Sequence, residues 1–150
     1  MAPGRERKER PVQEEDPLRV VNDFDAAWNA HDEEGVLDLF ADDAVARLVP
    51  APPGEPEAYE GKSQIRDLVR RHMPGFHAES RDHWAAGHQE GVGDRVIWES
   101  TFSSDRFRDL GAEKAEGTVE SIVKGGRIES FTLSLSNATM ERIRSADGSA

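Results

Sequence analysis

The sequence contains no cysteine, and this absence excludes several kinds of site at once. Without a thiol the chain cannot form a disulfide framework, a thiolate metal site or a cysteine nucleophile. Cations are also scarce, because 19 Lys and Arg residues stand against 30 Asp and Glu, which gives a formal net charge of −11. A charge of this sign repels phosphate backbones and anionic lipid surfaces, so we expect no nucleic-acid partner.

Long hydrophobic runs are missing as well. No apolar stretch approaches the roughly 18 residues of a membrane span, and no hydrophobic signal-peptide region follows Met1. We therefore expect a cytoplasmic protein without a membrane partner. The sequence also lacks a glycine-rich phosphate loop and a G-x-S-x-G elbow, and no cofactor is predicted.

At 150 residues the chain is long enough for one domain with a buried core. Residues 1–15 are expected to form a disordered tail, because Val12 is their only sizeable aliphatic residue besides Met1. We place the folded domain at residues 16–138. Residues 139–150 are expected to form a C-terminal tail with one helical turn at most.

Three helices are predicted in the first half of the chain. The first begins with Asp16 as N-cap and Pro17 in the first turn, and its apolar residues recur at helical spacing up to Trp28. The second helix is short and begins at Asp32. The third lies in YEGKSQIRDLVRRH, and its inward side is made by Ile65, Leu68, Val69 and His72.

Six carboxylates lie in the stretch AAWNAHDEEGVLDLFADDA, which raises the question of an acidic active site. Asp32 caps the second helix, and Glu33 and Glu34 stand in its first turn, where the helix dipole favours negative charge. Asp42 and Asp43 are expected in a turn before the next strand. Local structure therefore accounts for these five carboxylates, and they need no catalytic role.

From residue 76 onward the pattern changes to that of strands. The segments FHAESRDHWAAGHQEG, RVIWESTFSS, TVESIVK and RIESFTLSLS are predicted strands, and Gly125-Gly126 is a predicted two-residue hairpin turn. Helices followed by strands joined as hairpins predict an α+β fold with an antiparallel sheet.

Four segments of the chain together resemble the nuclear transport factor 2-like superfamily, and they are most similar to its SnoaL-like (polyketide cyclase-like) bacterial branch. The segments are FDAAWNAHDEEGVLDLFADDAV, YEGKSQIRDLV, VIWESTFSS and VESIVKGGRIESFTL, within roughly residues 18–135. The resemblance implies a cone-shaped α+β barrel, with three N-terminal helices packed in a curved antiparallel sheet around an apolar pocket. It also implies a homodimer. Because the superfamily contains isomerases, cyclases, hydrolases and non-enzymatic modules, it does not decide the reaction.

Glu120 is the first candidate catalytic residue. If Lys124 pairs with Arg127 across the glycine turn, alternation places Glu120 on the same face as Phe131 and Leu133. A carboxyl among hydrophobic side chains has a raised pKa and is suited to proton transfer. The alternative is that Glu120 reaches water at the outer end of the strand or pairs with an arginine.

The resemblance also limits the chemistry. In ketosteroid isomerases of the superfamily a strand acid and a first-helix tyrosine bind the oxyanion, while a separate aspartate moves the proton. Glu120 stands where the strand acid would be, but Phe24 replaces the tyrosine and Leu48 replaces the proton-moving aspartate. The second aspartate of the limonene epoxide hydrolase triad is also missing, since Phe131 and Leu133 stand in that region. Neither known reaction is expected.

The strand VIWESTFSS offers two opposite arrangements. If Glu99 points inward, it can form an acid/base couple with Glu120. If Trp98 and Phe102 point inward, they form a wall of the pocket, and this arrangement is favoured because large aromatic residues usually serve packing.

Four histidines cluster between the end of the third helix and residue 88, namely His72, His77, His83 and His88, but they share no metal-ligand spacing, and no metal site is predicted. His83 is the histidine proposed as a single catalytic base. Tyr59, the only tyrosine, either donates a hydrogen bond to a ligand or closes the core with an exposed hydroxyl.

Two functions remain open at this point, and whether the chain is an enzyme stays undecided. The first is a small-molecule-binding pocket protein, which as a cofactor-independent isomerase, cyclase or hydrolase would act on a hydrophobic metabolite. Its pocket wall would consist of Phe24, Trp28, Phe102, Phe131 and Leu133. The second is a non-catalytic dimerising or ligand-sequestering module, whose cone is filled by its own side chains.

Overall fold

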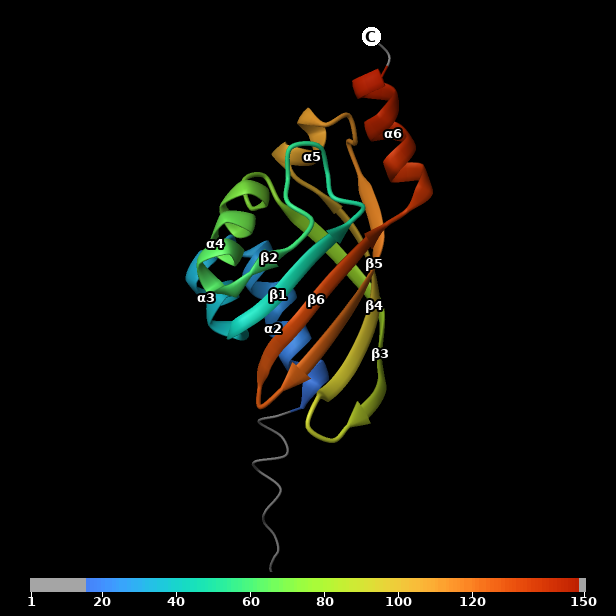
Figure 1. The fold of residues 1–150 in the computed structure, drawn as a ribbon. Coiled ribbons are helices and arrows are strands. Elements are labelled where there is room, and N and C mark those ends of the chain that lie inside the picture. Colours follow the sequence, from blue (N-terminus) through green and yellow to red (C-terminus); the bar gives the residue numbers. More distant parts are fainter. Residues whose placement is uncertain (1–15, 149–150) are drawn as a thin grey trace, which may run out of the picture.

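The computed structural model describes residues 16–148, so the predicted tail at residues 1–15 lies outside the described part of the chain. Along the chain, pairs of consecutive strands are separated by helices (Figure 1). The helices are α2 (Pro17–Asn29), α3 (Glu33–Leu39), α4 (Gly61–His72), α5 (Asp105–Asp109) and α6 (Asn137–Gly148). The strands are β1 (Phe40–Val49), β2 (Tyr59–Glu60), β3 (His77–Gln89), β4 (Gly93–Ser103), β5 (Ala115–Lys124) and β6 (Arg127–Leu135).

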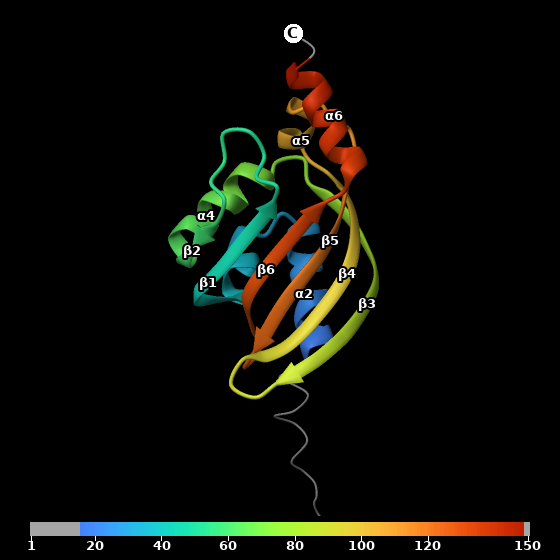
Figure 2. The same cartoon turned by 45° about the vertical axis from the view of Figure 1, so that its right-hand side comes forward.

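The strands form one curved sheet in the order β2-β1-β6-β5-β4-β3. Figure 2 shows this sheet curving around α2, as expected for the cone-shaped α+β fold. The neighbouring strands are antiparallel, except that β1 runs parallel to β6. The predicted fold class is therefore confirmed, with a mixed rather than a purely antiparallel sheet.

Helices α2 and α3 begin at the predicted N-cap residues, Asp16 and Asp32. Asp16 accepts a hydrogen bond from the Leu18 amide at 3.0 Å, and Asp32 accepts one from the Gly35 amide at 3.0 Å. These bonds satisfy backbone donors that would otherwise lack a partner at the helix start. No helix in residues 16–148 is long and apolar enough to cross a membrane.

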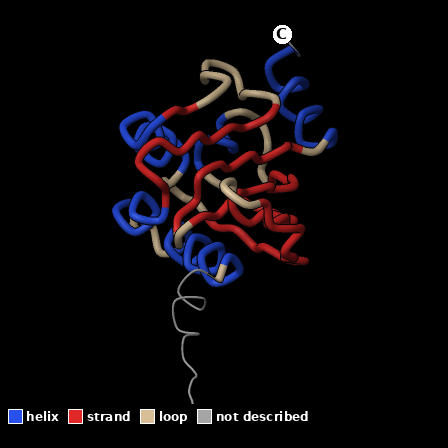
Figure 3. Tube along the Cα trace, turned by 60° about the horizontal axis from the view of Figure 1, so that its bottom comes forward, coloured by secondary structure: helices blue, strands red, loops and turns tan. Residues whose placement is uncertain are grey.

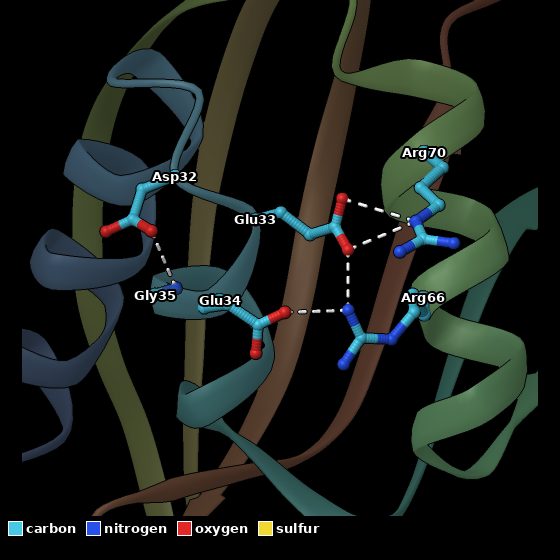
Figure 4. A network of polar contacts seen from close by, with 6 residues as sticks. All are labelled: Asp32, Glu33, Glu34, Gly35, Arg66 and Arg70. Atoms are coloured by element: carbon cyan, nitrogen blue, oxygen red, sulfur yellow. Dashed lines mark hydrogen bonds and ion pairs between the residues drawn. The ribbon is translucent and has the colours of Figure 1, made fainter.

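The acidic stretch joins two helices rather than forming a site (Figure 4). Glu33 and Glu34 of α3 accept hydrogen bonds from Arg66 Nη1 of α4, at 2.6 and 2.7 Å. Arg70 adds a third pairing, with its Nε 3.1 Å from Glu33 Oε2. Such partly exposed pairs are worth about 0–1 kcal/mol each, so their main effect is to orient α3 on α4.

Strand β1 begins sooner than expected, at Phe40, directly after α3. Its register with β6 shifts between Phe40 and Val45, so Asp42 and Asp43 are exposed in an irregular strand segment instead of a separate turn.

The β5–β6 hairpin has the predicted turn but not the predicted register. Lys124 pairs with Arg127, and both turn glycines have positive φ, but a bulge between Ile122 and Val123 places Ser130 opposite Ile122. The extra residue reverses which side chains of β5 share a face with the inward residues of β6. Consequently Val119 pairs with Leu133, and the predicted inward placement of Glu120 is wrong.

Helix α6 replaces the expected C-terminal tail over its described part. Met140 and Ile143 are buried, with 7% and 2% of their surface exposed. Thr139 Oγ1 also accepts a hydrogen bond from the Glu116 amide at 2.9 Å, which fixes the helix to β5. Figure 3 shows this helix apart from the others, near the C-terminus.

Candidate functional site

A cavity of about 70 Å³ lies between the helices and the inner face of the sheet. Its walls are mainly aromatic and aliphatic, and they include every predicted wall residue except Tyr59: Phe24, Trp28, Trp98, Phe102, Phe131 and Leu133. Ligand pockets usually measure about 300–1,000 Å³. The cavity in this conformation therefore suits only a compact molecule, and larger ligands require the aromatic side chains to move.

The aromatic rings of the cone pack against one another. Phe24 and Phe131 have ring centroids 5.4 Å apart, and Trp98 lies 6.4 Å from Phe131. Aromatic pairs at these distances stabilise the packing by about 0.5–1.5 kcal/mol each beyond the area that they bury. Any polar group at this wall is therefore in an apolar environment.

Asp25 is such a group. It follows Phe24 on α2, lines the cavity, and has 22% of its side chain exposed. Burial raises the pKa of the Asp25 carboxyl, and this effect exceeds the opposing influence of Ser80 and His83. The Ser80 hydroxyl is buried and has no hydrogen-bond partner among the described residues. It lies close enough to Asp25 to act against burial and lower the pKa of that carboxyl.

His83 lies beside Asp25, with its Nε2 3.3 Å from Asp25 Oδ2. An irregularity of β3 causes this placement, because Arg81 pairs with Glu99 and Trp84 with Ile97, leaving two residues opposite Trp98. The first of the two, Asp82, has φ +61°, a left-handed conformation that aspartate tolerates. The bulge turns His83 inward, where its ring stacks on Trp98 with centroids 5.3 Å apart.

A second histidine–carboxylate pair lies at another part of the wall. His72, on the inward side of α4, lines the cavity, and its Nε2 is 2.9 Å from Glu55 Oε1. Glu55 belongs to the loop between β1 and β2, and its side chain is completely buried. Tyr59 donates a hydrogen bond to Glu55 Oε1 at 2.9 Å, and Arg106 Nε donates one to Oε2 at 2.9 Å.

These contacts determine the charge of Glu55. Burial alone raises the pKa of Glu55, but hydrogen bonds and charges from His72, Arg106 and Tyr59 outweigh burial and lower it below its ordinary value. Burial and the neighbouring Glu55 carboxylate raise the pKa of Tyr59 to about 12. Tyr59 accepts a hydrogen bond from Arg71 at 2.6 Å, so its hydroxyl serves this network rather than the cavity.

The carboxylates predicted as catalytic lie on the outer face of the sheet. Glu120 is 48% exposed and pairs with Arg95 Nε at 2.6 Å, which was the alternative prediction. Glu99 accepts a hydrogen bond from the Thr118 hydroxyl at 3.0 Å. The favoured arrangement of β4, with Trp98 and Phe102 pointing inward, is therefore confirmed, and the alternative Glu99–Glu120 couple does not form in the pocket.

Comparison with known proteins agrees with this architecture. The SnoaL-like domain model matches residues 21–131. The chain belongs to the SnoaL-like domain family. A sequence comparison with curated proteins gives no match to this SnoaL-like protein.

Three solved structures illustrate the similarity of the fold. A protein from Bacillus subtilis described as a candidate isomerase has a TM-score of 0.67 at 15% identity, over 94% of this chain and 97% of the other. A candidate polyketide cyclase from Sinorhizobium meliloti has 0.60 at 19% identity, over 81% and 98%. A candidate ketosteroid isomerase from Kribbella flavida has 0.62 at 15% identity, over 84% and 79%.

The sequence did carry a signal for Asp25. In this SnoaL-like protein it occupies the fourth position after Val21, between Phe24 and Trp28, so it interrupts the apolar stripe of α2. His72 interrupts the stripe of α4 in the same way. Among the described residues, no three acidic or histidine side chains gather as metal ligands.

Proposed function

We propose that this SnoaL-like protein binds a small, neutral, hydrophobic molecule in the cone and transfers a proton on it without a cofactor, as an isomerase or cyclase does. Asp25 is the group that moves the proton. The observation that carries this proposal is a carboxyl on the wall of an apolar cavity whose pKa is raised by burial. Groups with such a pKa are frequent at catalytic sites.

The chemistry follows from the position of Asp25. Its carboxylate removes a proton from a carbon next to a carbonyl group, and the substrate becomes an enolate. When the substrate carries a C=C bond next to that carbon, the enolate is conjugated, and the protonated carboxyl returns the proton to its far carbon, which completes an isomerisation. His83 stands 3.3 Å from the carboxyl and positions it between these steps.

The cavity wall supports a neutral, apolar substrate. Among the described residues that line it there is no Lys or Arg, so an anionic ligand would lack a counter-charge. A volume of about 70 Å³ favours a compact molecule. The structural likeness to a candidate polyketide cyclase and a candidate ketosteroid isomerase agrees with carbonyl chemistry. The likeness to a designed binder of 17-OHP agrees with the binding of a small molecule.

An exchange assay tests this proposal without knowledge of the natural substrate. Small cyclic ketones are incubated with the protein in D2O, and loss of the α-proton signal is followed by NMR. We expect exchange with the wild type and with Glu120→Gln, which changes only an exposed carboxylate. Asp25→Asn should abolish it. Exchange that persists in Asp25→Asn, or its absence from the wild type with every ketone, contradicts the proposal.

The second candidate is a non-catalytic module that binds or sequesters a ligand. The packed rings favour it, because they occupy much of the cone and leave about 70 Å³. This function predicts no ketone exchange. A rise in the unfolding temperature with hydrophobic ligands, equal in wild type and Asp25→Asn, would support it.

We also propose that the outer face of the sheet forms a homodimer. Trp84 on β3 is 56% exposed, and it lies opposite Ile97 of β4 on that face. Tryptophan is enriched at protein–protein interfaces relative to the rest of the protein surface. Sedimentation velocity should give a dimer for the wild type and a monomer for Trp84→Glu, whereas a monomeric wild type contradicts the proposal.

A further inference from the structure

The Glu55 loop (residues 50–58) connects β1 to β2 and lies beside α5 (Figure 1). Pro53, Gly54 and Pro56 of this loop are exposed, whereas the Glu55 side chain is completely buried. Glu55 is held there by donors from three elements: Tyr59 of β2, His72 of α4 and Arg106 of α5. One of these donors, His72, also lines the cavity.

The protonation of His72 Nε2 follows from this geometry. Because its neighbours keep the pKa of Glu55 below the ordinary value, the carboxylate is ionised at neutral pH and can only accept hydrogen bonds. Nε2 at 2.9 Å must therefore be the donor. Within residues 16–148, no hydrogen bond is found for His72 Nδ1, and His72 itself lines the cavity, so Nδ1 is the ring nitrogen left to bind a further partner.

We propose that His72 is a second catalytic residue of the cavity, working opposite Asp25, and that Glu55 is the residue that positions it. This inference rests on the proposed proton transfer and completes it, because an enolate needs a donor at its oxygen. As Asp25 takes the proton from carbon, the doubly protonated imidazole of His72 gives its Nδ1 proton to the carbonyl oxygen. The imidazole left behind is neutral and keeps its Nε2–H on Glu55, and the reverse transfers restore both groups.

The alternative is a purely structural clasp that ties the Glu55 loop to the domain. Arg106 alone could provide that tie, because it binds both Glu55 Oε2 and the Pro53 carbonyl, the latter at 2.7 Å. A purely structural tie does not need the His72 imidazole at the cavity wall, nor does it need a carboxylate bound to His72 Nε2. A histidine with one nitrogen fixed by a carboxylate is the usual arrangement for directed proton transfer.

The first test concerns the histidine tautomer and needs no substrate. Nitrogen-15 NMR of the side chain should find the proton of neutral His72 on Nε2 in the wild type and in the control Glu120→Gln. In Glu55→Gln the amide replaces the anionic acceptor, so the Nδ1–H form should become populated. Phenol, a small neutral hydroxyl compound, should shift the Nδ1 resonance of the wild type. A Nδ1–H tautomer in the wild type, or an Nδ1 that does not respond to bound phenol, overturns the inference.

The second test uses ketone exchange and separates this inference from the proposed function. His72→Gln and Glu55→Gln should each lower kcat by about 100-fold with little change in KM, since general acid catalysis contributes about 10²–10⁴-fold. The pH profile of Glu55→Gln should differ from that of the wild type. If Asp25→Asn is inactive while His72→Gln retains full activity, the role of His72 is refuted and that of Asp25 stands. If the wild type shows no exchange, the proposed function fails, and the response of Nδ1 to phenol alone decides whether His72 contacts a ligand.

Discussion

Replacing Glu55 by alanine should destabilise the protein far more than replacing any exposed carboxylate. The side chain is completely buried, and its removal leaves His72 and Arg106 without their anionic partner. Breaking a buried ion pair by removing one partner costs about 3–5 kcal/mol. Because the Arg106 side chain is 27% exposed and can be rehydrated, we expect the lower end of that range, about 3 kcal/mol.

The matched control is Glu120→Ala, which also removes an arginine-bound carboxylate. Both partners of that pair are about half exposed, at 48% for Glu120 and 47% for Arg95, so the expected cost is about 0–1 kcal/mol. Urea unfolding of the wild type and the two variants measures the difference. Equal losses in the two variants would refute the conclusion that Glu55 is a buried, charge-paired anion.

The pH dependence gives this prediction a second part. The pKa of Glu55 is lowered in the folded state, so the folded protein binds the proton less readily than the unfolded chain. The extra stability is complete above the ordinary value of 4.5 and is lost as the pH falls through the lowered folded value. The difference between wild type and Glu55→Ala should therefore shrink in acid, and a difference that stays constant down to low pH would contradict this assignment.

Three further predictions concern the wall of the cone. Asp25→Asn should raise the thermal midpoint at neutral pH, because burial raises the pKa of Asp25 and disfavours its ionised form. The gain should disappear below pH 3.8, the ordinary pKa, where Asp25 is protonated in both the folded and the unfolded chain. A gain that persists there would contradict this cause. Phe131 is partly buried against the core, so Phe131→Ala should cost about 3 kcal/mol in urea unfolding, the lower end of the range for truncated phenylalanines, and it should increase the thermal shift given by bulkier hydrophobic ligands. Asp82→Val should lower the free energy of unfolding by about 1–3 kcal/mol, because a β-branched residue is strained at φ +61°. It should also change the ring-current shifts of His83. Unchanged stability and unchanged shifts would contradict the bulge at Asp82.

Much of the fold could be predicted because its signals are local. Caps such as Asp16 and Asp32 depend on residues two or three positions away, and so does the Gly125-Gly126 turn. The helical stripes are equally local. The same periodicity marks Asp25 as a polar residue on the apolar face of α2.

The inward face of β4 could be predicted from its aromatic residues, but the faces of β5 and of β3 around His83 could not, because two bulges decide them. The unpaired Glu129 of β6 reverses the face of Glu120, and an extra residue at Asp82 of β3 turns His83 inward. Both depend on pairing between strands, and either register leaves an alternating sequence pattern intact. Glu55 was missed for a different reason, since its partners come from three separate elements.

The most direct measurement is an NMR titration of the Asp25 side-chain carboxyl, assigned by comparison with Asp25→Asn. A proton-transfer group on an apolar wall should titrate clearly above the ordinary aspartate value of 3.8. A midpoint at or below that value would show that the carboxyl is well solvated or fully paired, and the proposed catalytic role of Asp25 would be contradicted.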